Sequence, residues 1–231
     1  MLEDLSQKVM SLEEIQESEE YKFFFRPVFR SAINLPDEEY LSLFLELQTW
    51  DPPKYIQEGF QYKFAGYDKK NRPIWIAAVG KYSIKEVLKR GDADQLERYG
   101  LKALIWIIKS IVAKSPAENQ SGTVVLIGNF EGYSMFQLLH PPTMAFRYKM
   151  AGKYKELMNS IFGVGIAVNM NRISAWLVNL FRPVLSYLDR VEFFGSDESK
   201  WRPRLEEIFE NAEIPSFDGN HRHFPPIILQ S

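Results

Sequence analysis

The side chains that most often carry enzyme chemistry are sparse in this sequence. The chain has three histidines, His140, His221 and His223, and no cysteine. A protein metal site usually needs three or four converging ligands, and the sequence offers neither an H-x-x-x-H pattern nor a cysteine cluster. We therefore expect no bound metal, no other cofactor and no disulfide or thiolate chemistry.

The common catalytic motifs are also missing. No G-x-S-x-G turn is present to hold the serine nucleophile of an α/β-hydrolase. Residues 128–132 (GNFEG) follow a predicted strand, as a phosphate-binding loop does, but they lack the Gly-Lys-Ser/Thr ending of such a loop. Paired carboxylates such as Glu13 and Glu14 are typical of solvated helix faces. The sequence predicts no catalytic residues, and we expect a protein that is not an enzyme.

Length and charge indicate one large globular domain, or one domain with a small companion. The chain has 231 residues, of which 45% are hydrophobic and 25% charged, and its net charge is −2. Such a charge gives no general attraction for nucleic acid. The start, MLEDLSQKVM, is unlike a secretory signal, and no apolar run approaches the roughly 18 residues of a membrane-spanning helix. We therefore predict a cytoplasmic protein with no nucleic-acid partner.

Aromatic residues are abundant, at 14% of the chain. Two arrangements explain such a composition: a core built from bulky rings, or an apolar cavity that rings line. Composition alone leaves both arrangements open.

The first 58 residues predict a helical cap region. Apolar residues over 2–12 recur at spacings of three and four, which is typical of a short helix. Ser11 and Glu14 fit a capping box at the start of a helical continuation. From Pro36 onward, a proline followed by acidic residues predicts a second, longer helix.

From residue 59 to residue 231, strands alternate with helices. In chain order the pattern predicts a hairpin over 59–80, helices over 81–90 and 92–114, a strand over 123–127, a helix over 141–158, a strand over 164–168, a helix over 174–185, a strand over 190–194 and a helix over 201–211. Short apolar runs such as TVVLI are typical of strands buried on both faces of a parallel sheet. The alternation predicts an α/β domain over 59–231, with right-handed βαβ units and a mainly parallel sheet.

The stretch from Val164 to Gly195 carries more apolar surface than one helix face needs. Its middle part contains six large apolar residues, which are Ile173, Trp176, Leu177, Leu180, Phe181 and Leu185. Either this helix packs on two sides, or one of its sides covers something that is not protein. An amphipathic helix on a sheet needs no ligand, so the residues alone leave both readings open.

Short motifs occur in a fixed order along most of the chain. They are PPKYIQEGF from Pro52, GYDKKNRPIWI from Gly66, VVLIGNFEGYS from Val124, FRPVL from Phe181, RVEFFG from Arg190 and IPSFDG from Ile214. These motifs and their order resemble those of the CRAL-TRIO (Sec14-like) family of lipid-binding domains, over roughly residues 50–220. Asn129 stands where the family commonly has aspartate, and Asn171 stands where it usually has proline.

The resemblance implies a fold in which a mainly parallel sheet forms the floor of a lipophilic pocket, helices form its walls and a mobile gate helix closes it. The gate would comprise residues 172–185. The ligand-binding residues that the resemblance implies are Val125, Ile127, Phe130, Tyr133, Phe136, Ile166, Val168, Ile173, Trp176, Leu177, Leu180 and Phe181. Arg182 and Arg190 are expected near a lipid headgroup or an anionic membrane surface.

The function that the resemblance implies is that of a carrier. The protein is expected to bind one lipophilic molecule, such as a phospholipid, tocopherol, retinoid or other terpenoid, and to transfer or present it at membranes that it contacts transiently. Enclosing such a molecule is favourable, because each CH₂ group removed from water is worth about 0.8 kcal/mol. Two alternatives stay open: a protein-interaction domain of the same fold with a filled cavity, and a lipid-modifying enzyme.

Overall fold

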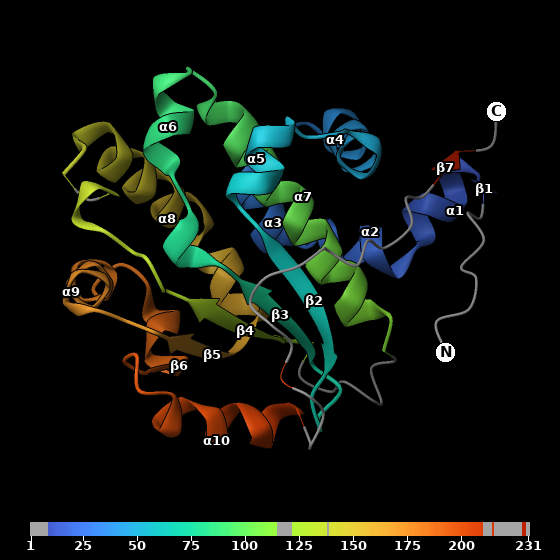
Figure 1. Ribbon diagram of the computed structural model, residues 1–231. Helices are drawn as coiled ribbons and strands as arrows, with labels where there is room; N and C mark the ends of the chain where they lie inside the picture. Colours follow the sequence, from blue (N-terminus) through green and yellow to red (C-terminus); the bar gives the residue numbers. More distant parts are fainter. Residues whose placement is uncertain (1–8, 115–121, 138, 210–213, 215–227, 230–231) are drawn as a thin grey trace.

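The structure is a computed structural model that describes residues 9–114, 122–137, 139–209, 214 and 228–229. Within these residues, five strands form one sheet in the order β2-β3-β4-β5-β6. The strands are β2 (Tyr62–Tyr67), β3 (Pro73–Ala77), β4 (Val124–Asn129), β5 (Phe162–Val168) and β6 (Val191–Phe193). Strands β2 and β3 form an antiparallel hairpin, whereas β3 to β6 run parallel (Figure 1). The predicted α/β fold with a mainly parallel sheet is confirmed.

Most helices lie close to the ranges that the sequence predicts, but no helix was predicted over residues 19–33 or 54–59. The α-helices are α1 (Leu12–Glu17), α2 (Glu19–Phe24), α3 (Pro27–Ile33), α4 (Asp37–Thr49), α5 (Lys54–Gly59), α6 (Ile84–Lys89), α7 (Ala93–Val112), α8 (Pro141–Ile161), α9 (Arg172–Phe181) and α10 (Glu198–Phe209). The short 3₁₀ helices are η1 (Val79–Lys81), η2 (Met135–Gln137) and η3 (Ser186–Arg190). Helix α9 ends earlier than predicted, because Pro183 has no N–H to continue the helical hydrogen bonds.

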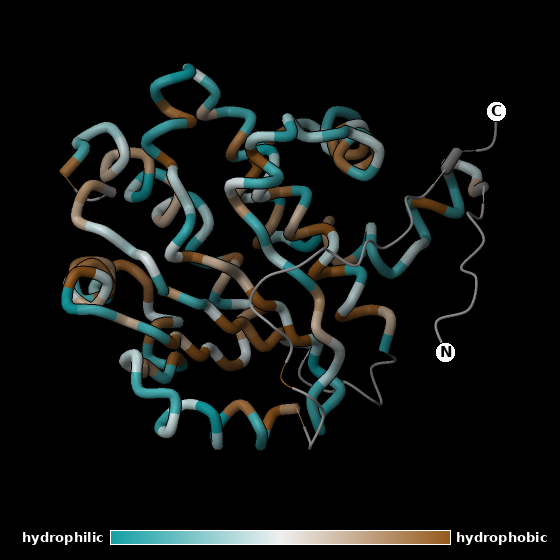
Figure 2. Tube along the Cα trace, in the orientation of Figure 1, coloured by the Kyte–Doolittle hydropathy of each residue, from teal (hydrophilic) through white to brown (hydrophobic). Residues whose placement is uncertain are grey.

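Helices cover both faces of the sheet. Helix α10 lies beneath one face, where its Leu205 and Phe209 pack on strand residues such as Ile74 and Ile127. Helices α7 and α8 lie over the other face (Figure 1). In Figure 2, α10 turns hydrophobic residues toward the sheet and hydrophilic residues away from it. Because both faces are covered, the strands read in the sequence as continuous apolar runs.

The N-terminal helices join the core that lies above the sheet. Helices α2 and α4 pack against α7, and α3 packs against α8. The rings of Phe24 and Phe44 are fully buried with their centroids 5.4 Å apart, and the Tyr40 hydroxyl donates to the backbone oxygen of Phe24 at 2.5 Å. Many aromatic residues therefore build a bulky core, which is the first of the two arrangements that composition left open. The domain boundary after residue 58 stays a prediction.

The start of the chain differs from the predicted short helix. Val9–Met10 form strand β1, which pairs in parallel with β7 (Ile228–Leu229). The prediction of a helix over 2–12 is therefore wrong at β1. The reason is that a strand partner so distant in the sequence leaves no trace in the local spacing of apolar residues. The residues before β1 lie outside the described residues. The predicted capping box is confirmed at α1, where the Ser11 N–H donates to Glu14 Oε2 at 2.8 Å and the Glu14 N–H donates to Ser11 Oγ at 3.2 Å.

Side-chain amides tie the carboxyl ends of β4 and β5 together. The buried Asn129 accepts at Oδ1 from the backbone N–H of Glu131 at 3.0 Å and from Nδ2 of Asn169 at 2.9 Å. Asn169 itself has a positive φ of 56°, a conformation that asparagine tolerates better than most residues. This junction determines where the chain leaves each strand.

Asn171 then sets the position of α9. Its Oδ1 accepts from the backbone N–H groups of Ile173 at 3.0 Å and Ser174 at 2.9 Å, which satisfies donors at the helix start. Its Nδ2 donates to the backbone oxygen of Tyr133 at 2.7 Å. Asn171 therefore both caps α9 and holds the helix against the segment that follows β4.

The 3₁₀ helix η1 lies directly against that segment at Gly80. A Cβ atom at position 80 would stand 1.9 Å from the backbone oxygen of Glu131, whereas one at the exposed Gly100 of α7 would meet nothing within 4 Å. We expect Gly80→Ala to lower the free energy of unfolding by about 1–3 kcal/mol. Gly100→Ala is the matched control, and we expect it to raise the free energy of unfolding, measured by urea denaturation, by up to about 1 kcal/mol. Equal effects of the two substitutions would contradict the close approach at Gly80.

Removing the Asn171 side chain is expected to loosen α9. Because Asn171→Ala removes the cap and leaves the Tyr133 oxygen without this donor, the free energy of unfolding should fall by about 1–2 kcal/mol in urea denaturation. Asn179→Ala changes an exposed asparagine of the same helix and should alter it by less than about 0.5 kcal/mol. If the two variants were equally stable, Asn171 would not be the residue that holds α9.

Candidate functional site

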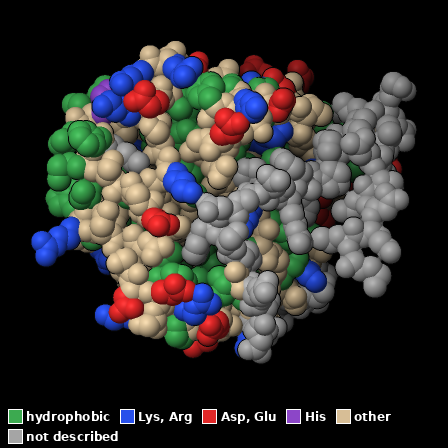
Figure 3. Space-filling view, viewed as in Figure 1, with side chains coloured by type: hydrophobic (Ala, Val, Ile, Leu, Met, Phe, Trp, Pro, Cys, Tyr) green, Lys and Arg blue, Asp and Glu red, His purple; other side chains and the backbone are tan. Residues whose placement is uncertain are grey.

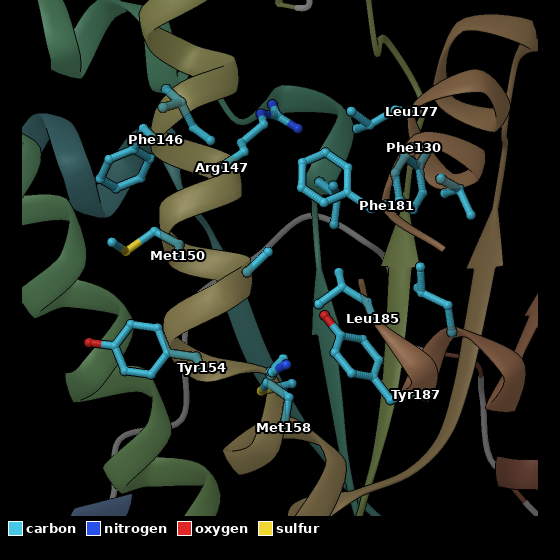
Figure 4. A pocket seen from close by; sticks show the side chains of 16 residues that line it. Phe130, Phe146, Arg147, Met150, Tyr154, Met158, Leu177, Phe181, Leu185 and Tyr187 are labelled. Carbon is cyan, nitrogen blue, oxygen red and sulfur yellow. The ribbon is translucent and has the colours of Figure 1, made fainter. Parts of the chain in front are cut away.

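A cavity of about 420 Å³ lies between α8 and α9 and reaches the end of β4 (Figure 4). Its volume falls within the range of about 300–1,000 Å³ that is usual for ligand pockets. Most of the lining side chains are apolar. They include Met150 and Met158 of α8, Leu177 and Phe181 of α9, Leu185, and Phe130 after β4.

Helix α9 presents an apolar face to this cavity. Its buried residues Ser174, Leu177 and Phe181 are spaced by three and four positions, as expected of one helix face. Leu177 and Phe181 line the cavity, and the Phe181 ring also stacks on Tyr148 of α8 with the centroids 4.6 Å apart. The other face of α9 is open to solvent and carries Trp176, which is 54% exposed. One side of α9 therefore covers the cavity, and the other exposes a large apolar ring.

A glycine keeps the sheet side of the cavity open. An added Cβ atom at Gly128 would lie 3.2 Å from the Phe130 ring and 3.4 Å from a methyl group of Val79. Phe130 and Val79 both line the cavity. A larger residue at position 128 would therefore push these two side chains into the open volume.

Tyr187 and Arg147 bring polar groups to this apolar space. The Tyr187 ring packs with its centroid 5.0 Å from that of Phe162, and burial raises the pKa of the Tyr187 hydroxyl to about 12. Arg147 reaches from α8 toward Leu177 and Phe181 (Figure 4), and burial lowers the pKa of its guanidinium. At neutral pH the phenol keeps its proton and the guanidinium keeps its charge. The cavity therefore offers a hydroxyl group and a cation to a ligand.

A smaller cavity of about 270 Å³ lies on the other side of α8, against α7. Four α8 residues at intervals of four line both cavities, and these are Phe146, Met150, Tyr154 and Met158. The Tyr154 hydroxyl points toward α7 and donates to Glu97 at 2.6 Å (Figure 4). Helix α8 therefore borders open volume on both sides and is anchored to α7 by a polar contact.

The structure brings together some of the ligand-binding residues that the sequence predicts. Three of them line the larger cavity: Phe130, Leu177 and Phe181. Three more pack in the same hydrophobic cluster, outside the cavity lining: Tyr133, Ile173 and Leu180. Phe136 and Trp176 are exposed to solvent.

The four predicted strand residues lie on the opposite face of the sheet. They pack under α10, and they are Val125, Ile127, Ile166 and Val168. Side chains alternate between the faces of a strand, so Leu126, between two of them, packs toward α7 and α8 instead. The prediction that these four residues line the cavity therefore needs correction. Because the strands carry apolar side chains on both faces, the sequence does not show which face of the sheet adjoins the cavity.

The two predicted arginines make contacts outside the cavity lining. Arg182 is exposed and lies 3.6 Å from Asp189. Arg190 donates to the backbone oxygens of Asn159, at 3.1 Å, and Phe162, at the end of α8. A cation at this position stabilises the C-terminus of a helix, where backbone carbonyl groups lack hydrogen-bond partners within the helix. Arg190 thus stabilises the end of α8, and a headgroup role for either arginine stays a prediction.

Sequence reasoning missed the contribution of α8. Arg147, Met150, Ala151 and Met158 all line the cavity from this helix. The available signal was the apolar series at intervals of four along the predicted helix. Such a series is also typical of plain core packing, so it does not by itself point to a cavity.

The described residues hold no group of three or more His, Cys, Asp or Glu side chains placed to bind a metal ion. None of the helices formed by these residues is long and apolar enough to cross a membrane. The chemistry of the site therefore rests on apolar surface, two cations, which are Arg147 and Lys155, and hydroxyl groups.

The comparisons with known proteins agree with this architecture. The family model of the CRAL/TRIO domain matches residues 57–219, well over half of the chain. The chain is similar to the phosphatidylinositol/phosphatidylcholine transfer protein SFH9 of Arabidopsis thaliana, with 22% identity over 185 residues, and the match covers 75% of this chain but only 30% of that protein's length. Its fold is similar to the crystal structure of Sfh5, with a TM-score of 0.57 and 13% identity, over 82% of this chain and 66% of that one. The chain therefore belongs to the CRAL/TRIO domain family.

Proposed function

We propose that this protein binds one lipophilic molecule in the cavity between α8 and α9 and transfers or presents it at membranes. The observation that carries this proposal is the cavity of about 420 Å³ with a mainly apolar lining. The space is open to solvent, so its apolar lining is exposed to water, and a lipophilic ligand that covered this lining would be bound favourably. We also propose that the protein acts without catalysing a reaction and that it is located in the cytoplasm.

The cavity lining and the relatives both favour a lipid as the ligand. The name of the Arabidopsis protein describes transfer of phosphatidylinositol and phosphatidylcholine. An apolar wall suits such molecules, because each CH₂ group that leaves water is worth about 0.8 kcal/mol. The volume of about 420 Å³ lies in the lower half of the usual range for ligand pockets. It therefore favours a single-chain or compact lipid, such as a terpenoid, retinoid or tocopherol, over a phospholipid with two long chains.

Helix α9 is the proposed gate. It is a ten-residue helix whose start is held by the Asn171 cap, and its Leu177 and Phe181 cover the cavity. A helix this short is marginally stable by itself, so its position depends on these contacts. Movement of α9 about its capped start would open the cavity while the cap keeps the helix attached.

An exposed apolar surface beside the gate supports contact with a membrane. Hydrophobic side chains gather at the left edge of the view in Figure 3, over α9 and the segment before α8. Four large apolar residues in these segments are more than half exposed, namely Met135, Phe136, Leu139 and Trp176. Arg172 and Arg182 are also exposed on and beside α9, where they suit an anionic lipid surface.

The two alternatives have less support. A protein-interaction domain with a filled cavity is disfavoured, because the side chains that line the cavity leave about 420 Å³ open. A lipid-modifying enzyme is disfavoured as well, because the lining residues include no serine, threonine, histidine or carboxylate to act as nucleophile or base.

Filling the cavity is expected to block ligand uptake. Ala151→Phe places a ring in the cavity, whereas Ala145→Phe places the same ring at an exposed position of α8. We expect wild-type protein to carry a lipophilic molecule in native mass spectrometry and to lose it on organic extraction. Uptake from a lipid panel should weaken at least tenfold, or about 1.4 kcal/mol, in Ala151→Phe and stay unchanged in Ala145→Phe. Wild-type protein that has the bare polypeptide mass and takes up no lipid would overturn the proposed function.

A charge on the exposed face of α9 is expected to impair transfer more than folding. Trp176→Asp removes an exposed apolar ring, so the free energy of unfolding should change by less than about 1 kcal/mol. Lipid transfer between vesicles should slow clearly, because a carboxylate is costly to bring to an anionic, apolar interface. Asn179→Asp adds the same charge at another exposed position of α9 and serves as the control. Equal transfer rates for wild type and Trp176→Asp would count against this face as the docking surface.

A further inference from the structure

Arg147 is an unusual residue for the wall of an apolar cavity. It lies on α8 and extends toward Leu177 and Phe181, on the far side of the open volume (Figure 4). Its Nε atom is fully enclosed and has no hydrogen-bond partner among the described residues. The site therefore contains a half-buried guanidinium whose Nε is shielded from water, in mainly hydrocarbon surroundings.

The charge of Arg147 is not balanced by any described neighbour. The lining of the cavity contains no carboxylate, and within the described residues no ion pair is formed by Arg147. The guanidinium carbon lies 5.6 Å from the centroid of the Tyr133 ring, and the Tyr133 hydroxyl favours the charged form of Arg147. That hydroxyl is itself buried without a hydrogen bond of ordinary geometry. A neutral phenol moderates a buried positive charge but does not neutralise it.

Shielding part of a cation from water without an anion beside it is unfavourable. Arginine is suited to bind carboxylate or phosphate through two parallel hydrogen bonds. The missing anion is therefore expected to arrive with the ligand. The cavity walls require that the rest of that ligand be apolar.

We propose that the ligand is an amphipathic lipid whose anionic end, a carboxylate or a phosphate, is bound inside the cavity by Arg147. This inference rests on the proposed function and narrows its ligand class. The anionic end is enclosed next to Tyr133 and α9, while the hydrocarbon chain extends along Met150, Leu185 and Met158.

Lys155 provides a matched contrast to Arg147. It also lines the cavity from α8, eight residues later, which is about 12 Å along the helix axis. It is exposed to solvent and lies 3.8 Å from Glu156, so its charge is already hydrated and paired. A general preference for anions would involve both residues, whereas a specific site requires Arg147 alone.

The test compares three ligands that share one hydrocarbon chain: oleic acid, oleyl phosphate and oleyl alcohol. Binding to the full chain is measured by isothermal titration at about pH 8, where the carboxyl group is ionised. We expect wild-type protein to bind at least one of the two anions about tenfold or more tightly than the alcohol. The anion with the higher affinity identifies the headgroup as carboxylate or phosphate.

Arg147→Met should remove that preference, because methionine keeps an unbranched apolar side chain and a similar helix propensity. Its affinity for the anion should fall about tenfold or more, while its affinity for oleyl alcohol stays equal or rises. Lys155→Met should keep the wild-type preference. The melting temperature of ligand-free Arg147→Met should be unchanged or higher, because the substitution removes a half-buried charge that has no anion beside it. If Arg147 had a purely structural role, the substitution would lower the melting temperature.

Two results would overturn the inference. The first is equal binding of the alcohol and both anions to wild-type protein, which needs no variant and so does not depend on the folding of Arg147→Met. The second is a retained anion preference in folded Arg147→Met. In both cases lipids still bind and the carrier function stands. If none of the three ligands binds and native mass spectrometry finds no lipid, the carrier function fails together with the inference.

Discussion

The hydrogen bond between the side-chain amides of Asn129 and Asn169 extends the pairing of β4 and β5 beyond their carboxyl ends, where the segments that lead to α8 and α9 begin. Asn129 is only 5% exposed. Its side-chain oxygen accepts from the backbone N–H of Glu131, which can only donate, and also from the side-chain N–H of Asn169. Neutral amides make these contacts without placing a net charge in a buried position. The segments that lead to α8 and α9 therefore start from two adjacent strand ends, and a space remains between the helices.

Helix α9 links the contents of that space to the surface of the molecule. Its start is held by polar contacts of Asn171, whereas Leu177 and Phe181 rest on the cavity. Because Leu177 and Phe181 belong to the cavity lining, a ligand in the cavity would change the contacts that hold α9 in place. The half-buried charge of Arg147 faces the same space, and no anion of the described residues lies beside it. An amphipathic lipid with an anionic end satisfies the apolar lining and the cation together.

Local patterns were sufficient to predict most of the fold. The capping box of Ser11 and Glu14, the acidic start of α4 and the short apolar runs of β4 and β5 each act over a few residues, so the sequence carries them openly. Alternation of strands and helices then leads to a mainly parallel sheet, because a crossover through a helix is the usual way to join parallel strands. The exceptions are β1, whose partner lies at the other end of the chain, and the short helices α2, α3 and α5, which no local pattern predicted.

The sequence by itself therefore determined most of the elements from β2 to α10, their order and the parallel sheet, together with the apolar face of α9. Only the tertiary structure decided which face of the sheet adjoins the cavity, since Val125 and Leu126 are equally apolar neighbours and only the positions of α8 and α10 distinguish them. It also decided that Arg190 contacts the end of α8 and that Arg147 faces the cavity. The physical reason is that a charged side chain looks the same in the sequence whether it is solvated, bound to carbonyl groups or half-buried in an apolar pocket.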